Sequence, residues 1–168
     1  RMHRRALRQA SRVIVLGEDM RDRIISKGVE PERVVIVRDG VAVPETVASA
    51  EHPVAQEVRC GFRFVIVHAG NLGFYGAWDT LVGAARRLEG DGVGLVFVGD
   101  GAVKAQVEAA AAGSSAVRFL PFRPAEQVPY VLAAGDLHVV TVKPGLEGVV
   151  VPSKLYGILA AGRPVLAI

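Results

Sequence analysis

The sequence has one cysteine among its 168 residues and no apolar run longer than a β-strand. This cysteine, Cys60, excludes an intrachain disulfide and a metal site built from cysteines, and it is consistent with a reducing cytoplasm. The apolar runs fall well below the ~18 consecutive residues of a membrane span. What the sequence does have is a hydrophobic content of 51%, which suffices for a packed core and argues against disorder.

The net charge of +3 is small, but the basic residues are unevenly distributed. Six of them lie in the first dozen positions, namely Arg1, His3, Arg4, Arg5, Arg8 and Arg12. We interpret this run as the solvated face of a helix, with contact to an anionic membrane as the alternative. Nucleic acid is not an expected partner, because no aromatic residues lie between the basic ones and no reader motif is present.

Strand-like and helix-like segments alternate along the whole chain. The predicted strands are 12–16, 33–37, 64–68, 93–98, 117–120, 137–141 and 164–168, and the predicted helices are 18–27, 77–89, 102–112, 124–134 and 152–161. Strands that are apolar on both faces, each followed by a helix, are typical of a parallel sheet covered on both sides. The sequence therefore predicts an α/β fold with a doubly wound, Rossmann-like parallel sheet.

The chain from residue 39 to about residue 60 is rich in small residues and proline, which favours an irregular linker. Because the sequence opens inside a predicted helix and ends on an apolar strand, we expect a fragment of a longer protein. In this interpretation residues 1–42 are the trailing βαβ part of a preceding domain and residues 43–60 are the linker. Residues 61–168 then form a nearly complete second domain that lacks its C-terminal helix.

Ligands of open parallel sheets bind outside the carboxyl ends of the strands, so the loops at that edge are the candidates. Residues 69–76 read AGNLGFYG, which matches neither the P-loop nor the dinucleotide fingerprint. Asp100 lies between two glycines and is interpreted as a turn or N-cap residue. Phe122 and Arg123 are placed to bracket a flat base. Turn requirements alone explain any single glycine loop, and no nucleophile triad or metal-ligand spacing is present.

Two histidines lie on or beside predicted strands at positions 68 and 138. We interpret His138 as a core residue or as a support for the site. His68 stands at the end of its strand, where it either faces the site or is buried.

The stretch from Gly145 to Ile168 combines an acidic residue with a helix start. Glu147 lies between two glycines, Pro152 and Ser153 open the helix, and Lys154 lies in its first turn. Free N–H groups and the helix dipole favour a phosphate at such a helix start. Because a carboxylate beside the phosphate would hold a hydroxyl-rich group, the stretch suggests a nucleotide-sugar ligand.

The chain from residue 10 onward resembles the family 4 glycosyltransferases of the GT-B fold. The resemblance rests on ASRVIVLGEDMRDRIISKGV, ERVVIVRDGV, VHAGNLG with WDTLVGAARRL, FVGDG, AAGDLHVV and VPSKLYGILAAGRPVLAI. Within that family it is closest to bacterial O-antigen amino-sugar transferases of the N-acetyl-L-fucosamine type. The resemblance implies that residues 1–42 end an acceptor domain and that the rest is the C-terminal, donor-binding half. It also implies sugar transfer with retention, without a metal or cofactor, in which backbone amides and basic side chains stabilise the leaving diphosphate.

The resemblance assigns Glu147 to the donor sugar and the backbone N–H groups of residues 148–150 to the phosphates. Gly157 replaces a second glutamate that holds the ribose in the family, while Asn71 and either Phe74 or Tyr75 replace its two phosphate-binding cations. We therefore expect Lys154 to supply the missing charge, with a solvent-facing Lys154 as the alternative. The candidate site consists of Glu147 and Lys154 as catalytic residues and Gly70, Asn71, Gly73, Phe122, Arg123, Gly148, Val149, Val150, Ser153 and Gly157 as donor-binding residues.

The predicted function is transfer of a sugar from a nucleotide-diphosphate-sugar to an envelope polysaccharide or a lipid-linked acceptor. Two alternatives remain open: a catalytically inactive nucleotide-sugar-binding domain, which the two replaced cations favour, and a GT-B nucleotide-sugar epimerase. A cytoplasmic location is expected, with peripheral association at the inner membrane face, because the basic N-terminal helix suits a membrane surface. The fragment alone is expected to be inactive.

Overall fold

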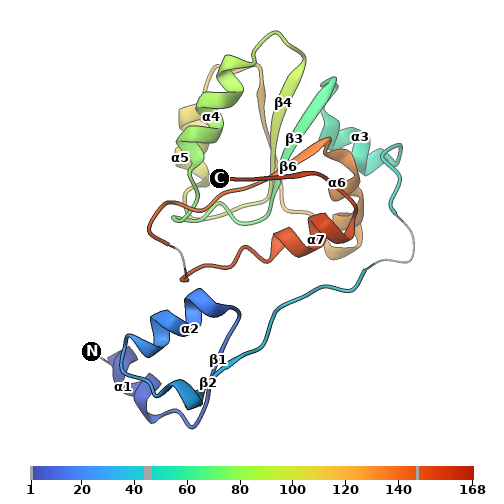
Figure 1. Ribbon diagram of the computed structural model, residues 1–168. Helices are drawn as coiled ribbons and strands as arrows, with labels where there is room; N and C mark the ends of the chain where they lie inside the picture. Colours follow the sequence, from blue (N-terminus) through green and yellow to red (C-terminus); the bar gives the residue numbers. More distant parts are fainter. Residues whose placement is uncertain (1, 44–46, 147) are drawn as a thin grey trace. The chain divides into compact units, whose positions relative to one another are not determined.

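The structure is a computed structural model that describes residues 2–43, 47–146 and 148–168 (Figure 1). The chain divides into two compact units. The first consists of Arg1–Gly40 together with Pro144–Ser153, and the second of Val41–Lys143 together with Lys154–Ile168. Each unit is described by itself below.

The first unit is a small βαβ arrangement. Its elements are α1 (Met2–Gln9), β1 (Val13–Val15), α2 (Glu18–Ile25), the 3-10 helix η1 (Pro31–Arg33) and β2 (Val34–Ile36). The two strands pair in parallel, with Val13 opposite Val34. Val15, Val29 and Val34 form the buried part of its core. These elements confirm the strands and the helix that the sequence predicts here, whereas the assignment of residues 1–42 to an acceptor domain stays a prediction.

The second unit is built on a parallel five-stranded sheet in the order β5-β4-β3-β6-β7. Its strands are β3 (Phe64–Ala69), β4 (Val93–Val98), β5 (Val117–Leu120), β6 (Leu137–Val140) and β7 (Val165–Ala167). Its helices are α3 (Pro53–Arg59), α4 (Trp78–Arg87), α5 (Lys104–Ala111), the 3-10 helix η2 (Ala125–Gln127), α6 (Val128–Ala134) and α7 (Lys154–Ala160). The sheet confirms the predicted doubly wound α/β fold, because the strand order reverses direction at β3.

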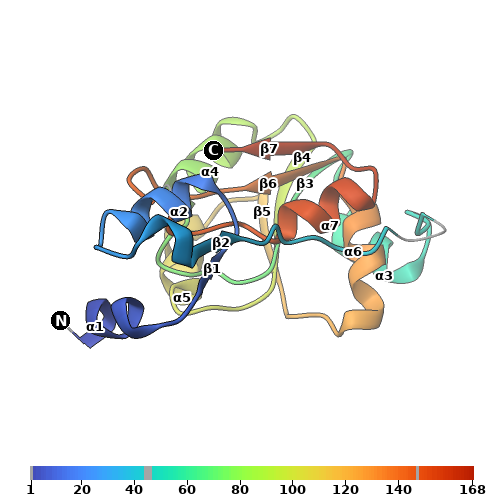
Figure 2. The same cartoon turned by 60° about the horizontal axis from the view of Figure 1, so that its bottom comes forward.

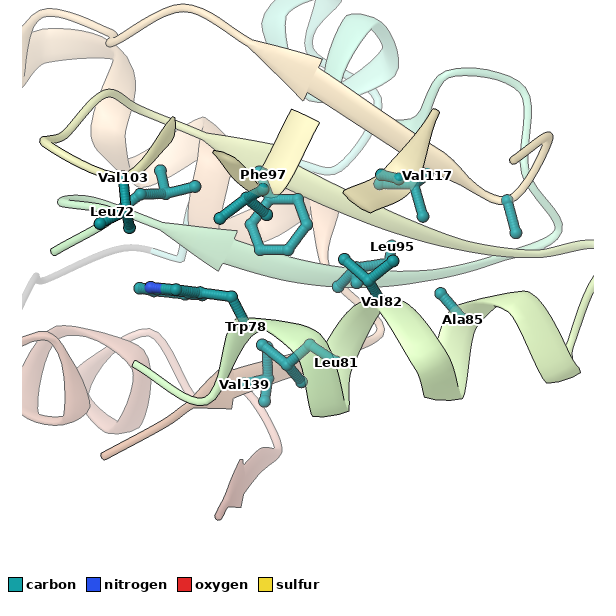
Figure 3. Close-up of a cluster of buried hydrophobic side chains, with 13 residues drawn as sticks. Leu72, Trp78, Leu81, Val82, Ala85, Leu95, Phe97, Val103, Val117 and Val139 are labelled. Carbon is teal, nitrogen blue, oxygen red and sulfur yellow. The ribbon is translucent and has the colours of Figure 1, made fainter. Parts of the chain in front are cut away.

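Helices cover both faces of this sheet, with α4 and α5 on one side and α3 and α6 on the other (Figures 1 and 2). The alternation of side chains along β3 fills both layers. Val65 and Val67 pack on the α3 and α6 side, whereas Ile66 packs on the α4 and α5 side. Figure 3 shows the second layer, in which Trp78 of α4 lies near Phe97 of β4 with ring centroids 6.1 Å apart.

Helix α3 corrects one expectation, because it lies inside residues 43–60, where the sequence suggests an irregular linker. The helix begins at Pro53, and the His52 side chain caps it by accepting a hydrogen bond from the Val54 N–H at 3.2 Å. Ala55 and Val58, three residues apart on one face, are fully buried in the second unit. The irregular conformation expected for residues 53–59 is therefore wrong, since burial of this face stabilises a helix.

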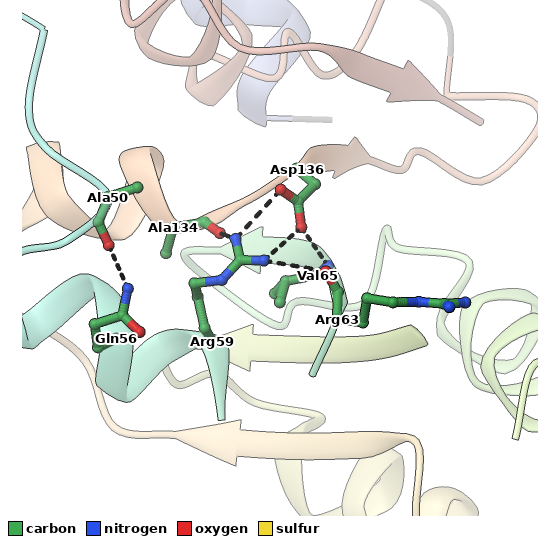
Figure 4. Close-up of polar contacts among 7 residues, drawn as sticks. All are labelled: Ala50, Gln56, Arg59, Arg63, Val65, Ala134 and Asp136. Atoms are coloured by element: carbon green, nitrogen blue, oxygen red, sulfur yellow. Dashed lines mark hydrogen bonds and ion pairs between the residues drawn. The ribbon is translucent and has the colours of Figure 1, made fainter. Parts of the chain in front are cut away.

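Arg59 at the end of α3 ties this helix to the amino ends of two strands (Figure 4). Its guanidinium donates to both carboxylate oxygens of Asp136, at 3.2 and 3.0 Å, and to the Ala134 carbonyl at 2.8 Å. The Asp136 carboxylate also accepts the Val65 N–H at 2.8 Å. These bonds fix α3, β3 and the start of β6 at the sheet edge opposite to the candidate site.

Candidate functional site

The carboxyl ends of β3 and β4 bring the two glycine loops of the second unit into direct contact. The Gly70 N–H donates to the Val98 carbonyl and the Leu72 N–H to the Asp100 carbonyl, both at 2.8 Å. A Cβ at Gly99 would clash with the backbone carbonyl of Gly70, so loop packing requires this glycine. The Asp100 side chain accepts the Gly101 N–H at 2.8 Å, so it is engaged within this loop.

The loop after β3 is held in one conformation by its neighbours. The Trp78 indole N–H donates to the Gly73 carbonyl at 2.7 Å, and the Ala77 N–H donates to the Thr141 hydroxyl at 2.9 Å. The Asn71 amide donates to the Tyr75 hydroxyl at 3.0 Å. The Asn71 side chain is therefore engaged within its own loop, and the tryptophan and threonine are anchors that the sequence analysis missed.

Lys154, the first residue of α7, reaches the end of β3. Its Nζ lies 3.0 Å from Nε2 of His68, which is the second-last residue of β3 and lies two positions before Gly70. Gly70 has φ +124°, and a Cβ placed there would be 3.4 Å from the Lys154 Nζ. The ammonium group thus lies against a glycine at the carboxyl edge of the sheet.

The environment of this pair sets its charge. Burial of the His68 ring is the largest effect and, together with the Lys154 charge, lowers the pKa of His68 to about 3, although the Val139 carbonyl and the nearby Asn71 backbone favour the protonated ring and oppose this shift. Burial also lowers the pKa of Lys154 to about 8. At neutral pH the histidine is uncharged and most Lys154 side chains are still cationic. The pair therefore carries a single positive charge.

The predicted base-binding residues differ in exposure. Phe122 is 71% exposed beyond the end of β5. The Arg123 guanidinium forms an ion pair with Glu57 of α3, and its side chain is only 15% exposed. The arginine charge is thus already paired, so the backbone of residue 123 and the Phe122 ring are the groups available to a base.

The remaining predicted residues fall in different places. Gly148 and Val149 belong to the first unit, as does Val150, and the N–H groups of the two valines both donate to the Leu146 carbonyl, at 3.0 and 3.3 Å. These donors are engaged in a turn, so the predicted phosphate role requires that turn to open. Ser153 is exposed in the first unit, and Glu147 lies outside the described residues.

Gly157, which stands where the family resemblance places a second glutamate, lies in α7. A Cβ added there would meet one atom, Cδ1 of Leu132, at 3.9 Å. The position therefore has space for a larger side chain, and glycine is not required there by packing.

Within residues 2–43, 47–146 and 148–168, no group of three or more His, Cys, Asp or Glu side chains is arranged to hold a metal ion. No helix in the same part of the chain has the length and apolar character needed to cross a membrane.

Comparisons with known proteins place the similarity over almost the whole chain. Residues 63–168 match the model of the family described as glycosyl transferases group 1. WcaI of Escherichia coli K12, named as a glycosyl transferase of colanic acid biosynthesis, is 28% identical over 95% of this chain and 40% of its own length. WbjE of Pseudomonas aeruginosa, named as a glycosyltransferase, is 28% identical over 95% of this chain and 41% of its own. The chain therefore spans less than half of the curated relatives that it matches.

Among solved structures, Anabaena HepE, crystallised in complex with UDP and glucose, superposes with a TM-score of 0.75. The identity is 22%, over 96% of this chain and 45% of HepE. This likeness shows that the two chains share a fold over the matched length.

Proposed function

The chain belongs to the family of glycosyl transferases group 1, and on this premise we propose that it is the nucleotide-sugar-binding part of a glycosyltransferase. The observation that carries the proposal is the Lys154 ammonium beside Gly70 at the carboxyl edge of the sheet. Open α/β sheets bind their ligands at this edge. A cation held there, next to a glycine that admits close approach, is suited to the diphosphate of a nucleotide-sugar. HepE, a structural neighbour, was crystallised with UDP and glucose, which supports the same class of ligand.

In the proposed reaction the bond between the anomeric carbon and the diphosphate oxygen breaks, and its electron pair leaves on the diphosphate. The oxygen of the acceptor hydroxyl forms the new bond to the anomeric carbon with retention of configuration, and its proton passes to the leaving diphosphate. Lys154 stabilises the negative charge that develops on the leaving group, a role that elsewhere contributes about 3–4 kcal/mol for a single donor. The proposal assigns Glu147 to the donor sugar and includes no metal or cofactor.

The acceptor in this proposal is an envelope polysaccharide or a lipid-linked sugar, and the donor is an amino-sugar nucleotide of the O-antigen or N-acetyl-L-fucosamine type. The name of WcaI, which assigns it to colanic acid biosynthesis, supports an envelope polysaccharide. We place the enzyme in the cytoplasm at the inner face of the membrane, where the basic residues near α1 favour contact with anionic lipid.

Activity of the full-length protein tests this proposal. Transfer from a panel of UDP- and dTDP-sugars to an extracted lipid-linked acceptor should be detectable by mass spectrometry and unaffected by EDTA. Lys154→Ala and Glu147→Ala should each remove most of the activity without loss of the folded state. Arg87→Ala, which removes an exposed cation at the far end of α4, is the matched control and should keep full activity.

The same assay separates the alternatives. A binding domain without catalysis would retain the donor and neither transfer nor hydrolyse it. An epimerase would convert the donor sugar in the absence of any acceptor. Wild-type transfer by both the Lys154 and the Glu147 variants would refute the assignment of the site.

A further inference from the structure

We propose that His68 is a positioning residue that holds the Lys154 ammonium at the diphosphate site as a neutral hydrogen-bond acceptor. This inference rests on the proposed function for the identity of the ligand. Its geometric part, the pairing of two side chains 86 residues apart, rests on the structure alone.

The two nitrogens of the His68 ring have different partners, and these partners decide the tautomer. Nδ1 lies 3.3 Å from the Val139 carbonyl oxygen. Because a carbonyl oxygen only accepts hydrogen bonds, Nδ1 must carry the proton. Nε2 then presents a lone pair, and it accepts an N–H of Lys154 at 3.0 Å.

The ring itself is fixed by packing. His68 is 1% exposed, and its ring meets that of Trp78 edge to face, with centroids 4.8 Å apart. The ring of Phe97 also contacts the His68 ring, with centroids 5.9 Å apart. The acceptor nitrogen therefore has one orientation, and Lys154, whose long side chain is otherwise flexible, is held in one place.

A neutral acceptor has a consequence that a carboxylate would not have. An aspartate or glutamate in this position would form an ion pair with Lys154 and cancel the charge that attracts a diphosphate. A neutral imidazole leaves the charge intact and occupies one of the three ammonium N–H groups, so two remain for phosphate oxygens. Within the part of the chain that the structure describes, the ion pairs do not include Lys154.

Burial supports this arrangement. The low pKa of His68, about 3, keeps the ring neutral throughout the physiological range. Because protonation would place two positive charges 3.0 Å apart, the pair functions only in the neutral-histidine state.

UDP affinity of the full-length protein, measured by calorimetry, tests the inference with four variants. Lys154→Ala should weaken UDP binding roughly 10- to 100-fold, the range expected for a hydrogen bond to a charged group. His68→Leu should weaken it about 3- to 10-fold, as expected for loss of an ordinary hydrogen bond. His68→Gln, which keeps a neutral acceptor, should recover most of that loss. In the double variant, His68→Leu should add nothing to the effect of Lys154→Ala, because it acts only through that lysine.

His138 provides the matched control. It is also fully buried in the sheet, and its Nε2 lies 2.9 Å from a backbone oxygen, that of Leu132. His138→Leu should lower the thermal stability and leave UDP affinity unchanged. If His68→Leu behaves in the same way while Lys154→Ala loses affinity, the positioning role is wrong and the proposed function stands. If Lys154→Ala binds UDP as the wild type does, the diphosphate role of Lys154 itself is wrong.

One measurement does not depend on how the variants fold. Nitrogen NMR of the histidine rings in the wild-type protein should show His68 with its proton on Nδ1 and none on Nε2. A proton on Nε2, or a doubly protonated ring at neutral pH, would overturn the pairing.

Discussion

Replacing Asp136 by alanine removes a carboxylate that joins three elements at the amino edge of the sheet (Figure 4). One carboxylate oxygen accepts the Val65 N–H at 2.8 Å and an Arg59 N–H at 3.0 Å. Val65 is fully buried, so in the alanine variant its N–H loses the acceptor and has no access to water. The Arg59 guanidinium keeps the Ala134 carbonyl but loses its charged partner.

The expected cost follows from these two losses. A buried donor left without a partner costs about 1–3 kcal/mol. The ion pair contributes less, about 0.2–1 kcal/mol, because its side chains are 20% and 32% exposed to solvent. Asp136→Ala should therefore destabilise the protein by about 1–4 kcal/mol, which corresponds to a fall in Tm of roughly 3–15 °C. Asp136→Asn keeps an acceptor for the Val65 N–H, so its loss of stability should be less than half that of Asp136→Ala.

Differential scanning calorimetry with urea unfolding measures both variants. The control is Glu108→Ala on α5, which breaks an exposed pair with Lys104 at 3.9 Å and should cost less than about 0.5 kcal/mol. The pKa of Asp136 is lowered overall: desolvation raises it, but the Arg59 and Val65 hydrogen bonds outweigh that effect. The stability that Asp136 provides should therefore be present at neutral pH and be lost as the pH falls through its folded-state pKa. A Tm of Asp136→Ala within 2 °C of the wild type, about the shift expected for half a kcal/mol, would refute this reasoning.

Three further predictions concern the candidate site. The UDP affinity of the full-length protein should fall as the pH rises through about 8, since Lys154 then loses its charge, and a flat profile in a buffer series would contradict this. Acid should destabilise the wild type between about 6.5 and about 3, because unfolded His68 gains a proton that the buried ring does not; His68→Gln should show a shallower loss in urea titrations at each pH. Trp78→Phe removes the indole N–H bond to the Gly73 carbonyl, 2.7 Å long, and should cost about 1 kcal/mol in chemical unfolding, whereas no change would indicate that the loop is held otherwise.

The fold was predictable because its signal is local. The strands at 64–69, 93–98 and 117–120 are continuous apolar runs, and both faces of the sheet are covered, as such runs indicate. Helix α3 was missed because its stretch begins with proline and small residues. A proline at the first helical position followed by Val54 and Val58, four apart, was the signal that could have revealed it.

The site was predictable only in part. Lys154 stood out as a cation beside a helix start, and Asp100 as a turn residue, because both features are read from neighbouring positions. The partner of Lys154 could not be read in this way. His68 is 86 positions away and reaches the lysine only after β3 and α7 have packed into one unit. The same holds for Arg123, whose charge is paired by Glu57 of a helix that the sequence did not reveal.

A crystal structure of the full-length protein with UDP would test the central claim most directly. The account predicts the Lys154 Nζ about 2.7–2.9 Å from an oxygen of the β-phosphate, with His68 Nε2 still accepting a second N–H of the same ammonium group. A diphosphate bound elsewhere, with Lys154 in contact with His68 alone, would contradict it.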